Sequence, residues 1–229
     1  MGDTGVLRGA RPGTILVDMT TSSPALAKEI SLAAEKKGCS SIDAPVSGGD
    51  VGAKNGTLSI MMGGERGAIE TILPLLEVMG KTIKVMGGPG AGQHTKMANQ
   101  ILIATTMIGM VEGLLYAQRA GLDLMETIAA VGAGAAGSWS INNYGPRLVK
   151  GDIAPGFMVE HFVKDLKIAL DESAAMNLKL PGLELAYELY TRLMTIGHAK
   201  SGTHSLMIAL AEMNKVNFQT TGPWVTRKD

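Results

Sequence analysis

The sequence predicts an α/β sheet domain over residues 1–92, followed by an all-helical domain over residues 93–229. Short apolar runs alternate with helical patterns as far as Gly92, which is typical of an α/β sheet. A long helical pattern begins at Gln93, and no convincing strand follows it. With 45% apolar residues in 229, the chain is long enough to bury a sizeable core in one or two domains.

Four strands and two helices are expected in the first part. Residues 14–18 form a short apolar run that predicts the first strand, and Ser22, Ser23 and Pro24 mark a helix start. That helix is expected over 25–37, with Gly38 as its end. The remaining elements are strands over 40–44, 57–62 and 82–86, and a helix over 65–79 closed by Gly80.

The second part reads as a series of helices. The most apolar window, 101–111, is too short to cross a bilayer and is closed by Glu112, so it predicts a buried core helix. The chain from Gln219 is expected to be frayed. The expected helices cover residues 93–120, 124–131, 140–148, 159–177, 182–195 and 205–215.

Composition excludes several classes of function. The 21 Lys and Arg residues balance 21 Asp and Glu residues, which argues against a nucleic-acid or acidic membrane partner. A single cysteine, Cys39, rules out an internal disulfide framework and a cysteine-based zinc cluster, and the four histidines do not form a metal-binding pattern. No secretory signal is visible in residues 1–11, and a cytoplasmic location is predicted.

Residues 43–49, D-A-P-V-S-G-G, follow a predicted strand directly. Ligands of open α/β sheets bind at the carboxyl ends of strands. Ser47 offers a hydroxyl, and Gly48 and Gly49 offer closely approaching N–H groups, a combination that suits a carboxylate. A plain turn explains the same residues equally well. A serine-hydrolase elbow does not fit, because Pro45 occupies the first glycine position of G-x-S-x-G.

Lys96 and Asn99 lie three residues apart near the start of the long helix and therefore share a face. Partial burial lowers a lysine pKa, which would let Lys96 pass a proton to a carbonyl or alkoxide oxygen while the amide orients the ligand. Spacing alone favours a different interpretation, in which Gln93, His94 and Lys96 form a solvated first turn.

Lys164 and Asp165 are adjacent on a predicted helix. Their side chains leave the helix about 100° apart, so they are not expected to pair with each other. A surface helix is the expectation from these two residues alone.

Taken in chain order, these segments resemble the β-hydroxyacid dehydrogenase family, the group of 3-hydroxyisobutyrate dehydrogenase and tartronate semialdehyde reductase. Residues 17–24, V-D-M-T-T-S-S-P, resemble the D-x-S/T-T segment near the nicotinamide. Residues 43–49 match the family's substrate signature without a change. Residues 90–99 resemble its catalytic segment G-x-G-x-x-x-K-x-x-x-N, and residues 164–166 resemble its late K-D-L segment.

The resemblance implies a partial Rossmann-type sheet of the 6-phosphogluconate dehydrogenase kind, and a helical domain that makes a homo-oligomer. It implies hydride transfer between C4 of NAD or NADP and the alcohol carbon of a small carboxylated alcohol or semialdehyde, without a metal. It also assigns roles to residues. Lys96 would be the proton donor and acceptor, Asn99 would position the substrate, Ser47, Gly48 and Gly49 would hold its carboxylate, and Thr21 and Lys164 would lie along the nicotinamide.

The departure from the family is at the front of the chain. Family members begin with a strand and G-x-G-x-x-G, and this chain begins beyond those elements, so weak cofactor binding or none is expected. Three hypotheses follow from these observations. They are a β-hydroxyacid dehydrogenase, a truncated and non-catalytic dimerising module of that family, and a hydrolase that uses Ser47 with His94 as its base.

Overall fold

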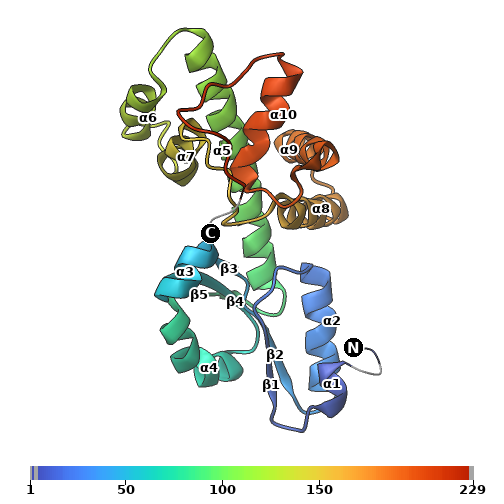
Figure 1. Ribbon diagram of the computed structural model, residues 1–229. Coiled ribbons are helices and arrows are strands. Elements are labelled where there is room, and N and C mark those ends of the chain that lie inside the picture. Colours follow the sequence, from blue (N-terminus) through green and yellow to red (C-terminus); the bar gives the residue numbers. More distant parts are fainter. Residues whose placement is uncertain (1, 3–4, 227–229) are drawn as a thin grey trace. The chain divides into compact units, whose positions relative to one another are not determined.

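The computed structural model describes residue 2 and residues 5–226. The chain divides into two compact units, Met1–Asn99 and Gln100–Asp229, and the division falls inside one long helix, α5 (Ala91–Arg119). Figure 1 shows the helices and strands of both units.

The first unit contains a mixed, five-stranded sheet. Strands β1 (Ile15–Asp18) and β2 (Ser40–Asp43) pair in parallel, and so do β4 (Leu58–Gly63) and β5 (Gly80–Gly87). β2 runs antiparallel to β4 and pairs with it only through Asp43 opposite Gly63, the last residue of each strand. The two parallel pairs therefore meet end to end, and the carboxyl ends of four strands lie together.

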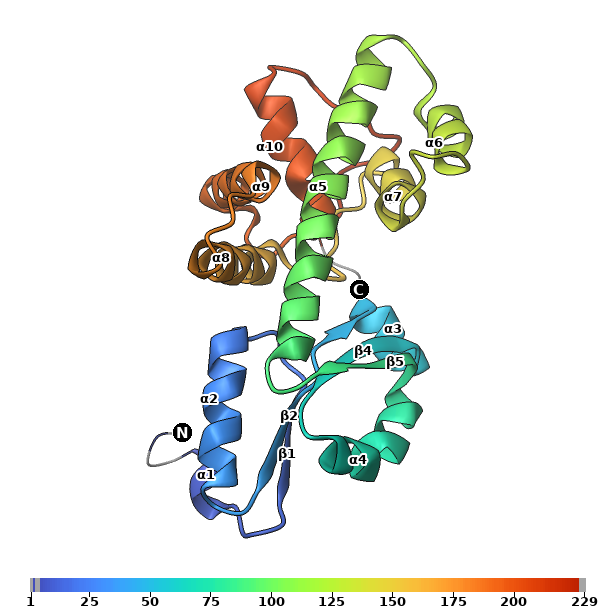
Figure 2. The same ribbon diagram turned by 180° about the vertical axis from the view of Figure 1, so that it is seen from behind.

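Two helices connect the parallel strands and cover the sheet. α2 (Pro24–Glu35) and α4 (Arg66–Met79) lie on opposite sides of it (Figures 1 and 2). Ser23 caps α2 by accepting a hydrogen bond from Leu26 N–H at 3.1 Å, as its sequence position predicts. The core lies between the sheet and α4. Its buried members are Ile42, Ala44, Leu58, Ile60, Met62, Ala68, Ile69, Ile72 and Leu76.

All four predicted strands and both predicted helices of this unit are present, with end points that differ by at most two residues. Three short elements were not predicted. They are α1 (Val6–Gly9), β3 (Val46–Ser47) and α3 (Gly49–Asn55). β3 continues from β2 after a break at Pro45 and pairs antiparallel with β4, with Ser47 opposite Ser59. A two-residue strand has no periodicity from which it can be predicted.

In the part of the second unit that the structure describes, the regular elements are all helices, and two isolated β-bridges are the exceptions. Its core includes Phe162 of α8 (Val159–Ala175) and Tyr190 of α9 (Pro181–Leu193), which are both fully buried and whose rings meet edge to face at 4.9 Å. The Tyr190 hydroxyl donates to the Thr203 carbonyl at 2.9 Å, and complete burial raises the pKa of this hydroxyl well above its ordinary value. Besides α5, the helices are α6 (Leu124–Gly132), α7 (Gly145–Val149), α8 (Val159–Ala175), α9 (Pro181–Leu193) and α10 (Leu206–Met213).

Two predicted helices of this unit have irregular ends. Residues 140–148 begin with a π-helical turn, η1 (Ser140–Tyr144), and α9 continues into a second one, η2 (Met194–His198). A 3-10 turn, η3 (Thr203–Ser205), precedes α10. The expectation of a frayed tail from Gln219 was wrong as far as Val225. Val225 N–H donates to the Gly151 carbonyl at 2.8 Å, and its carbonyl accepts from Ile153 N–H at 2.9 Å.

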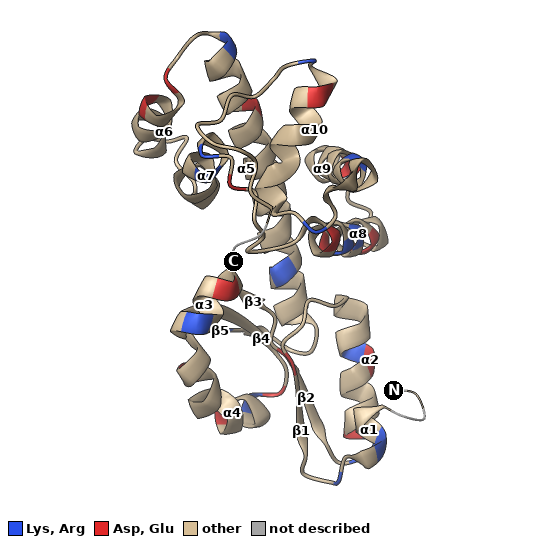
Figure 3. Ribbon diagram, viewed as in Figure 1, with Lys and Arg blue, Asp and Glu red and all other residues tan. Residues whose placement is uncertain are grey.

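Basic and acidic residues are interspersed along the elements of each unit (Figure 3), in agreement with the balanced net charge. Among the described residues one helix, α5, is long and apolar enough to span a membrane. Half of its most apolar window is buried inside the protein, which supports a core helix.

The Asp152 carboxylate joins the segment before α8 to Arg147. Arg147 donates to both carboxylate oxygens, at 2.8 and 3.0 Å, and Ala154 N–H donates at 2.9 Å. Burial alone would raise the pKa of Asp152, but the hydrogen bonds from Arg147 and Ala154, together with the nearby charges of Arg147 and His204, outweigh burial and hold this pKa below its ordinary value. The folded state therefore favours the charged carboxylate.

We expect Asp152→Asn to lower the free energy of unfolding by about 1.5–3 kcal/mol at pH 7, because bonds to a charged group are lost. Since the folded-state pKa is below the unfolded value, the carboxylate stabilises the fold above about pH 4, and this effect is lost as the pH falls through the lowered pKa. Urea denaturation of both proteins at pH 7 and pH 3 should show the difference narrowing. Asp171→Asn, which removes an exposed pair with Lys167, serves as the control; a difference that persists at pH 3 would contradict the prediction.

Candidate functional site

Four strand ends meet in a row in the α/β unit. Asp18 of β1 lies beside Asp43 of β2, Asp43 lies opposite Gly63 of β4, and Gly63 lies beside Gly87 of β5. The segments that follow these strands therefore leave from one place, which is where open α/β sheets bind ligands. They contain residues 19–23, residues 44–49 and the turn that leads into α5.

Asp43 holds the start of α5. Its carboxylate is only 4% exposed and accepts from Gly90 N–H at 2.7 Å and from Gln93 N–H at 2.8 Å. The first N–H groups of a helix have no partner within the helix, and a negative charge there also interacts favourably with the helix dipole. A Cβ atom on Gly63 would lie 2.7 Å from Asp43 Oδ1, and one on Gly92 would lie 2.9 Å from Oδ2. Glycine at both positions leaves room for the carboxylate.

Lys96 is buried at the second turn of α5. Its side chain is 7% exposed, and Nζ donates to the Val46 carbonyl at 2.8 Å. The expectation of a solvated first turn was wrong for Lys96 and for Gln93, which is 0% exposed, because this turn packs against the strand ends. The ammonium group is thus bonded to the residue that directly precedes Ser47.

Residues 47–49 form the passage from β3 into α3. The plain-turn interpretation was wrong, since Ser47 pairs with β4 and Gly48 precedes the first turn of a helix. Gly48 has φ 134° and Gly49 has φ 63°, both in the region that favours glycine. Both glycines are exposed, and the first N–H groups of α3 have no partner within the helix. This segment is chemically suited to an anion.

Thr21 lies in the segment between β1 and α2, and its neighbours are fixed on both sides. Asp18 Oδ1 accepts from the amide of Thr20 at 2.9 Å and from its hydroxyl at 2.7 Å, and Asp18 Oδ2 accepts from the Ser22 hydroxyl at 3.1 Å. Gln93 of α5 forms hydrogen bonds with the backbone of Thr20 and Ser22 in the same segment. Sequence reasoning did not identify Asp18 or Gln93 as parts of the site. The acid that ends a predicted strand was the available signal for Asp18.

Lys164 belongs to the helical unit. The expectation that it does not pair with Asp165 was wrong, because Lys164 Nζ lies 2.9 Å from Asp165 Oδ1. The two side chains diverge at Cβ, but the lysine stem is long enough to bend back. Lys164 is half exposed, whereas Asp165 is buried and also accepts from Gln100 Nε2 at 2.6 Å.

Gln100 is a third residue that sequence reasoning missed. In the pattern K-x-x-x-N the amide comes four residues after the lysine, and four residues after Lys96 is Gln100, whereas Asn99 comes three after it. On a helix the four-residue spacing also keeps two side chains on one face. Counting the pattern would have found Gln100. The role predicted for Asn99 stays a prediction.

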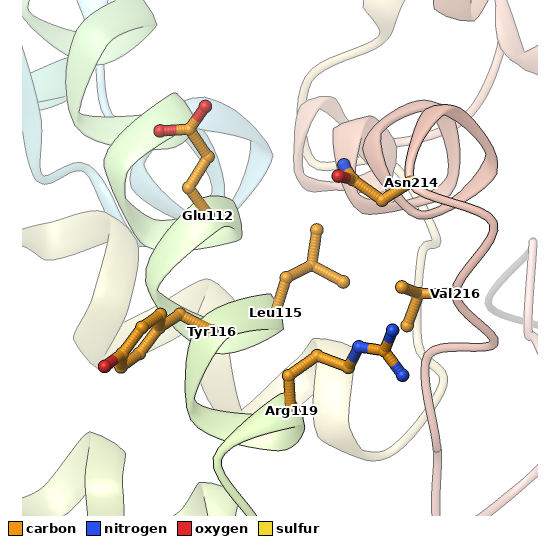
Figure 4. Close-up of a pocket in the computed structure, with 6 residues that line it drawn as sticks. All are labelled: Glu112, Leu115, Tyr116, Arg119, Asn214 and Val216. Atoms are coloured by element: carbon orange, nitrogen blue, oxygen red, sulfur yellow. The ribbon is translucent and has the colours of Figure 1, made fainter.

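One pocket of about 340 Å³ lies in the helical unit, between α5 and the end of α10 (Figure 4). None of the sequence-predicted site residues lines it. Among the described residues, no group of three or more His, Cys, Asp or Glu side chains is arranged to hold a metal ion. The pocket is lined by Glu112, Leu115, Tyr116, Arg119, Asn214 and Val216.

Comparison with known proteins shows which family the sequence of this chain matches. Residues 1–88 match the NAD-binding domain of 6-phosphogluconate dehydrogenase, and residues 90–211 match the NAD-binding domain of NADP-dependent 3-hydroxyisobutyrate dehydrogenase. The chain is 54% identical to the probable 3-hydroxyisobutyrate dehydrogenase-like 1 of Arabidopsis thaliana over 95% of its own length, and it spans 65% of that relative's length.

Two further proteins are similar to this chain over most of its length. An uncharacterized oxidoreductase of Bacillus subtilis is 50% identical over 90% of this chain and 71% of its own length. Among solved structures, 3-hydroxyisobutyrate dehydrogenase of Mycobacterium tuberculosis with L-serine matches with a TM-score of 0.83 and 30% identity, over 90% of this chain and 72% of that one.

We expect Asp43→Asn to lower the free energy of unfolding by roughly 1–3 kcal/mol, because an amide can accept only one of the two bonds that the carboxylate accepts. Chemical denaturation measures the loss, and hydrogen exchange should be faster at the Gly90 and Gln93 amides. Asp50→Asn on exposed α3 is the matched control and should change stability by less than about 0.5 kcal/mol. Unchanged exchange at both amides would contradict the role assigned to Asp43.

Proposed function

The chain belongs to the β-hydroxyacid dehydrogenase family, and on that premise we propose that it transfers a hydride between NAD or NADP and the hydroxyl-bearing carbon of a short β-hydroxy acid or semialdehyde. The observation that carries the proposal is the bond from buried Lys96 Nζ to the Val46 carbonyl, 2.8 Å long. It sets a proton-carrying group beside the segment of Ser47, Gly48 and Gly49. Oxidation of a carboxylated alcohol needs both a group that takes up the proton and a site that binds the carboxylate.

The residues around the strand ends are chemically suited to a nicotinamide. The segment with Thr21 offers hydroxyl and backbone groups at the carboxyl ends of parallel strands. It is fixed by the hydrogen bonds that it donates to Asp18 and by the one that it accepts from Gln93. When bound, NAD or NADP supplies or accepts the hydride at C4 of its nicotinamide ring. Family membership supports a nicotinamide cofactor, and either dinucleotide is consistent with the residues.

Lys96 has the role of moving a proton. In the reducing direction its ammonium donates to the carbonyl oxygen, and in the oxidising direction the neutral amine accepts the proton of the substrate hydroxyl. The Val46 carbonyl holds Nζ in place by accepting one of its N–H bonds.

Ser47, Gly48 and Gly49 have the role of binding the substrate carboxylate. The Ser47 hydroxyl and the N–H groups at the start of α3 donate to its oxygens, and an anion at that position also interacts favourably with the helix end. With the carboxylate fixed there, the carbon that bears the hydroxyl would be brought to Lys96.

The remaining roles come from the resemblance. Asn99 would orient the substrate, and Thr21 and Lys164 would contact the nicotinamide. Gln100 competes with Asn99 for the orienting role, because it stands at the four-residue spacing of the pattern. Replacing each amide by leucine and comparing KM would separate the two.

The proposed substrate class is supported by what related proteins hold or are named for. One relative of solved structure contains L-serine, and the family model is named for 3-hydroxyisobutyrate. Both compounds are carboxylic acids with a hydroxyl on the third carbon. We propose acids of this type, and the semialdehydes that their oxidation yields, as the substrates of this chain.

Assembly and location are also proposals. The helical unit exposes large apolar side chains on α5, such as Leu102 and Tyr116, which supports a homo-oligomer through this unit. A cytoplasmic location is retained as a prediction, although the Arabidopsis relative carries the word mitochondrial in its name.

We expect Lys96→Ala to lower turnover by roughly 10²- to 10⁴-fold, the usual effect of losing a general acid or base. Lys96→Arg should lose as much, because arginine keeps the charge but does not release a proton. Steady-state oxidation of 3-hydroxyisobutyrate with NAD and with NADP measures both effects. Lys54→Ala on exposed α3 controls for loss of a surface charge; turnover that survives in Lys96→Ala would contradict the proton-transfer role.

We expect Ser47→Ala to act mainly on KM, raising it by roughly 5- to 30-fold, which corresponds to about 1–2 kcal/mol of lost binding. Turnover at saturating substrate should change little. Ser59→Ala, at the paired position on β4, is the control and should leave KM unaffected. If Ser47→Ala lowers only the melting temperature, the hydroxyl has a structural role and does not bind the carboxylate.

A further inference from the structure

The side chain of Gln93 uses both ends of its amide on one segment of backbone. It is 0% exposed, its Nε2 donates to the Thr20 carbonyl at 2.8 Å, and its Oε1 accepts from Ser22 N–H at 3.1 Å. The two bonds therefore flank Thr21. They join residues that are more than 70 positions apart in the chain.

This arrangement has the hydrogen-bond pattern of a strand. In a parallel pair, one residue bonds the carbonyl of the residue before its partner and the N–H of the residue after it. The Gln93 amide does the same with Thr20 and Ser22, so it holds the backbone at Thr21 as a neighbouring strand would. The segment that carries Thr21 lies beyond the end of β1 and is fixed by a side chain instead.

Gln93 is itself held firmly. Its own N–H donates to the buried Asp43 carboxylate at 2.8 Å, and Lys96 follows three residues later on the same helix. Residues three apart on a helix are neighbours on its surface. A buried amide that loses its partners costs free energy, so its two bonds to Thr20 and Ser22 are strongly favoured over any other position.

We propose that Gln93 is a positioning residue that sets the Thr21 segment relative to Lys96, and so fixes the separation between the bound nicotinamide and the proton donor. This inference rests on the proposed function, in which Thr21 contacts the nicotinamide. It assigns to Gln93 no contact with the substrate or with the reacting atoms.

The helical unit offers a matched control. Gln118 makes the same pair of bonds around Phe218, because its Nε2 donates to the Asn217 carbonyl at 2.9 Å and its Oε1 accepts from Gln219 N–H at 2.8 Å. Gln118→Leu removes a pair of hydrogen bonds of the same pattern as Gln93→Leu does, without touching the Thr21 segment. Any effect shared by the two variants is a general loss of stability.

The experiment measures nicotinamide mononucleotide binding by calorimetry and hydrogen exchange at the Ser22 amide, on the full chain. For Gln93→Leu we expect nucleotide binding to weaken about tenfold and Ser22 exchange to accelerate at least about tenfold, while the affinity for L-serine stays within about twofold. Gln118→Leu should leave all three unchanged. Gln93→Glu keeps the volume and the acceptor for Ser22 N–H but loses the donor to Thr20, so it should weaken nucleotide binding by a smaller factor and serves if the leucine variant does not fold.

The outcomes separate this inference from the proposed function. If the unmodified chain binds nicotinamide mononucleotide and both Gln93 variants bind it equally well, the positioning role is wrong and the function stands. If Gln118→Leu weakens binding as much as Gln93→Leu, the effect is general destabilisation and the role is again wrong. A lack of nucleotide binding by the unmodified chain would contradict the proposed function, and the inference with it.

Discussion

The two hydrogen bonds that the Asp43 carboxylate accepts at the start of α5 are the contact on which the rest of the α/β unit depends. One buried charge ends β2, lies opposite the end of β4 and receives Gly90 N–H and Gln93 N–H. Its desolvation is offset by these two bonds and by the helix end that it faces. Because α5 starts there, the positions of Gln93 and Lys96 follow from Asp43. The site is therefore an extension of the sheet.

Elements with a clear period were predictable from the sequence, and the short junctions between them were not. The strands ending at Asp18 and Asp43 and the helix capped by Ser23 carry apolar patterns or capping residues that operate locally. β3 and α3 lack such signals, since Pro45 interrupts the strand and the two glycines resemble a turn. The burial of Lys96 could not be predicted either, because it results from packing against strand ends that lie far away in the chain.

The candidate site was predictable where a motif carries it and unpredictable where a tertiary contact does. Residues 43–49 match the family's substrate signature without a change, and the role predicted for Lys96 followed from the resemblance. Gln93 was missed because its partners, Thr20 and Ser22, lie more than 70 positions away in the chain, so local spacing does not indicate the contact. The pairing of Lys164 with Asp165 was misjudged for a different reason. A rule about the direction in which side chains leave a helix does not limit how far a lysine can bend.

The break at Pro45 has a consequence for selectivity. The Pro45 carbonyl accepts from Met61 N–H at 3.0 Å, and Ser47 pairs with Ser59, so the segment next to Lys96 is hydrogen-bonded to β4 along its length. These hydrogen bonds hold the segment in place, so we expect it not to open and close as a mobile loop does. For a ligand bound to this segment by its carboxylate, the distance from the carboxylate to Lys96 is therefore fixed. We expect an acid one methylene longer to carry its hydroxyl past the lysine, so the sheet itself would set the permitted chain length.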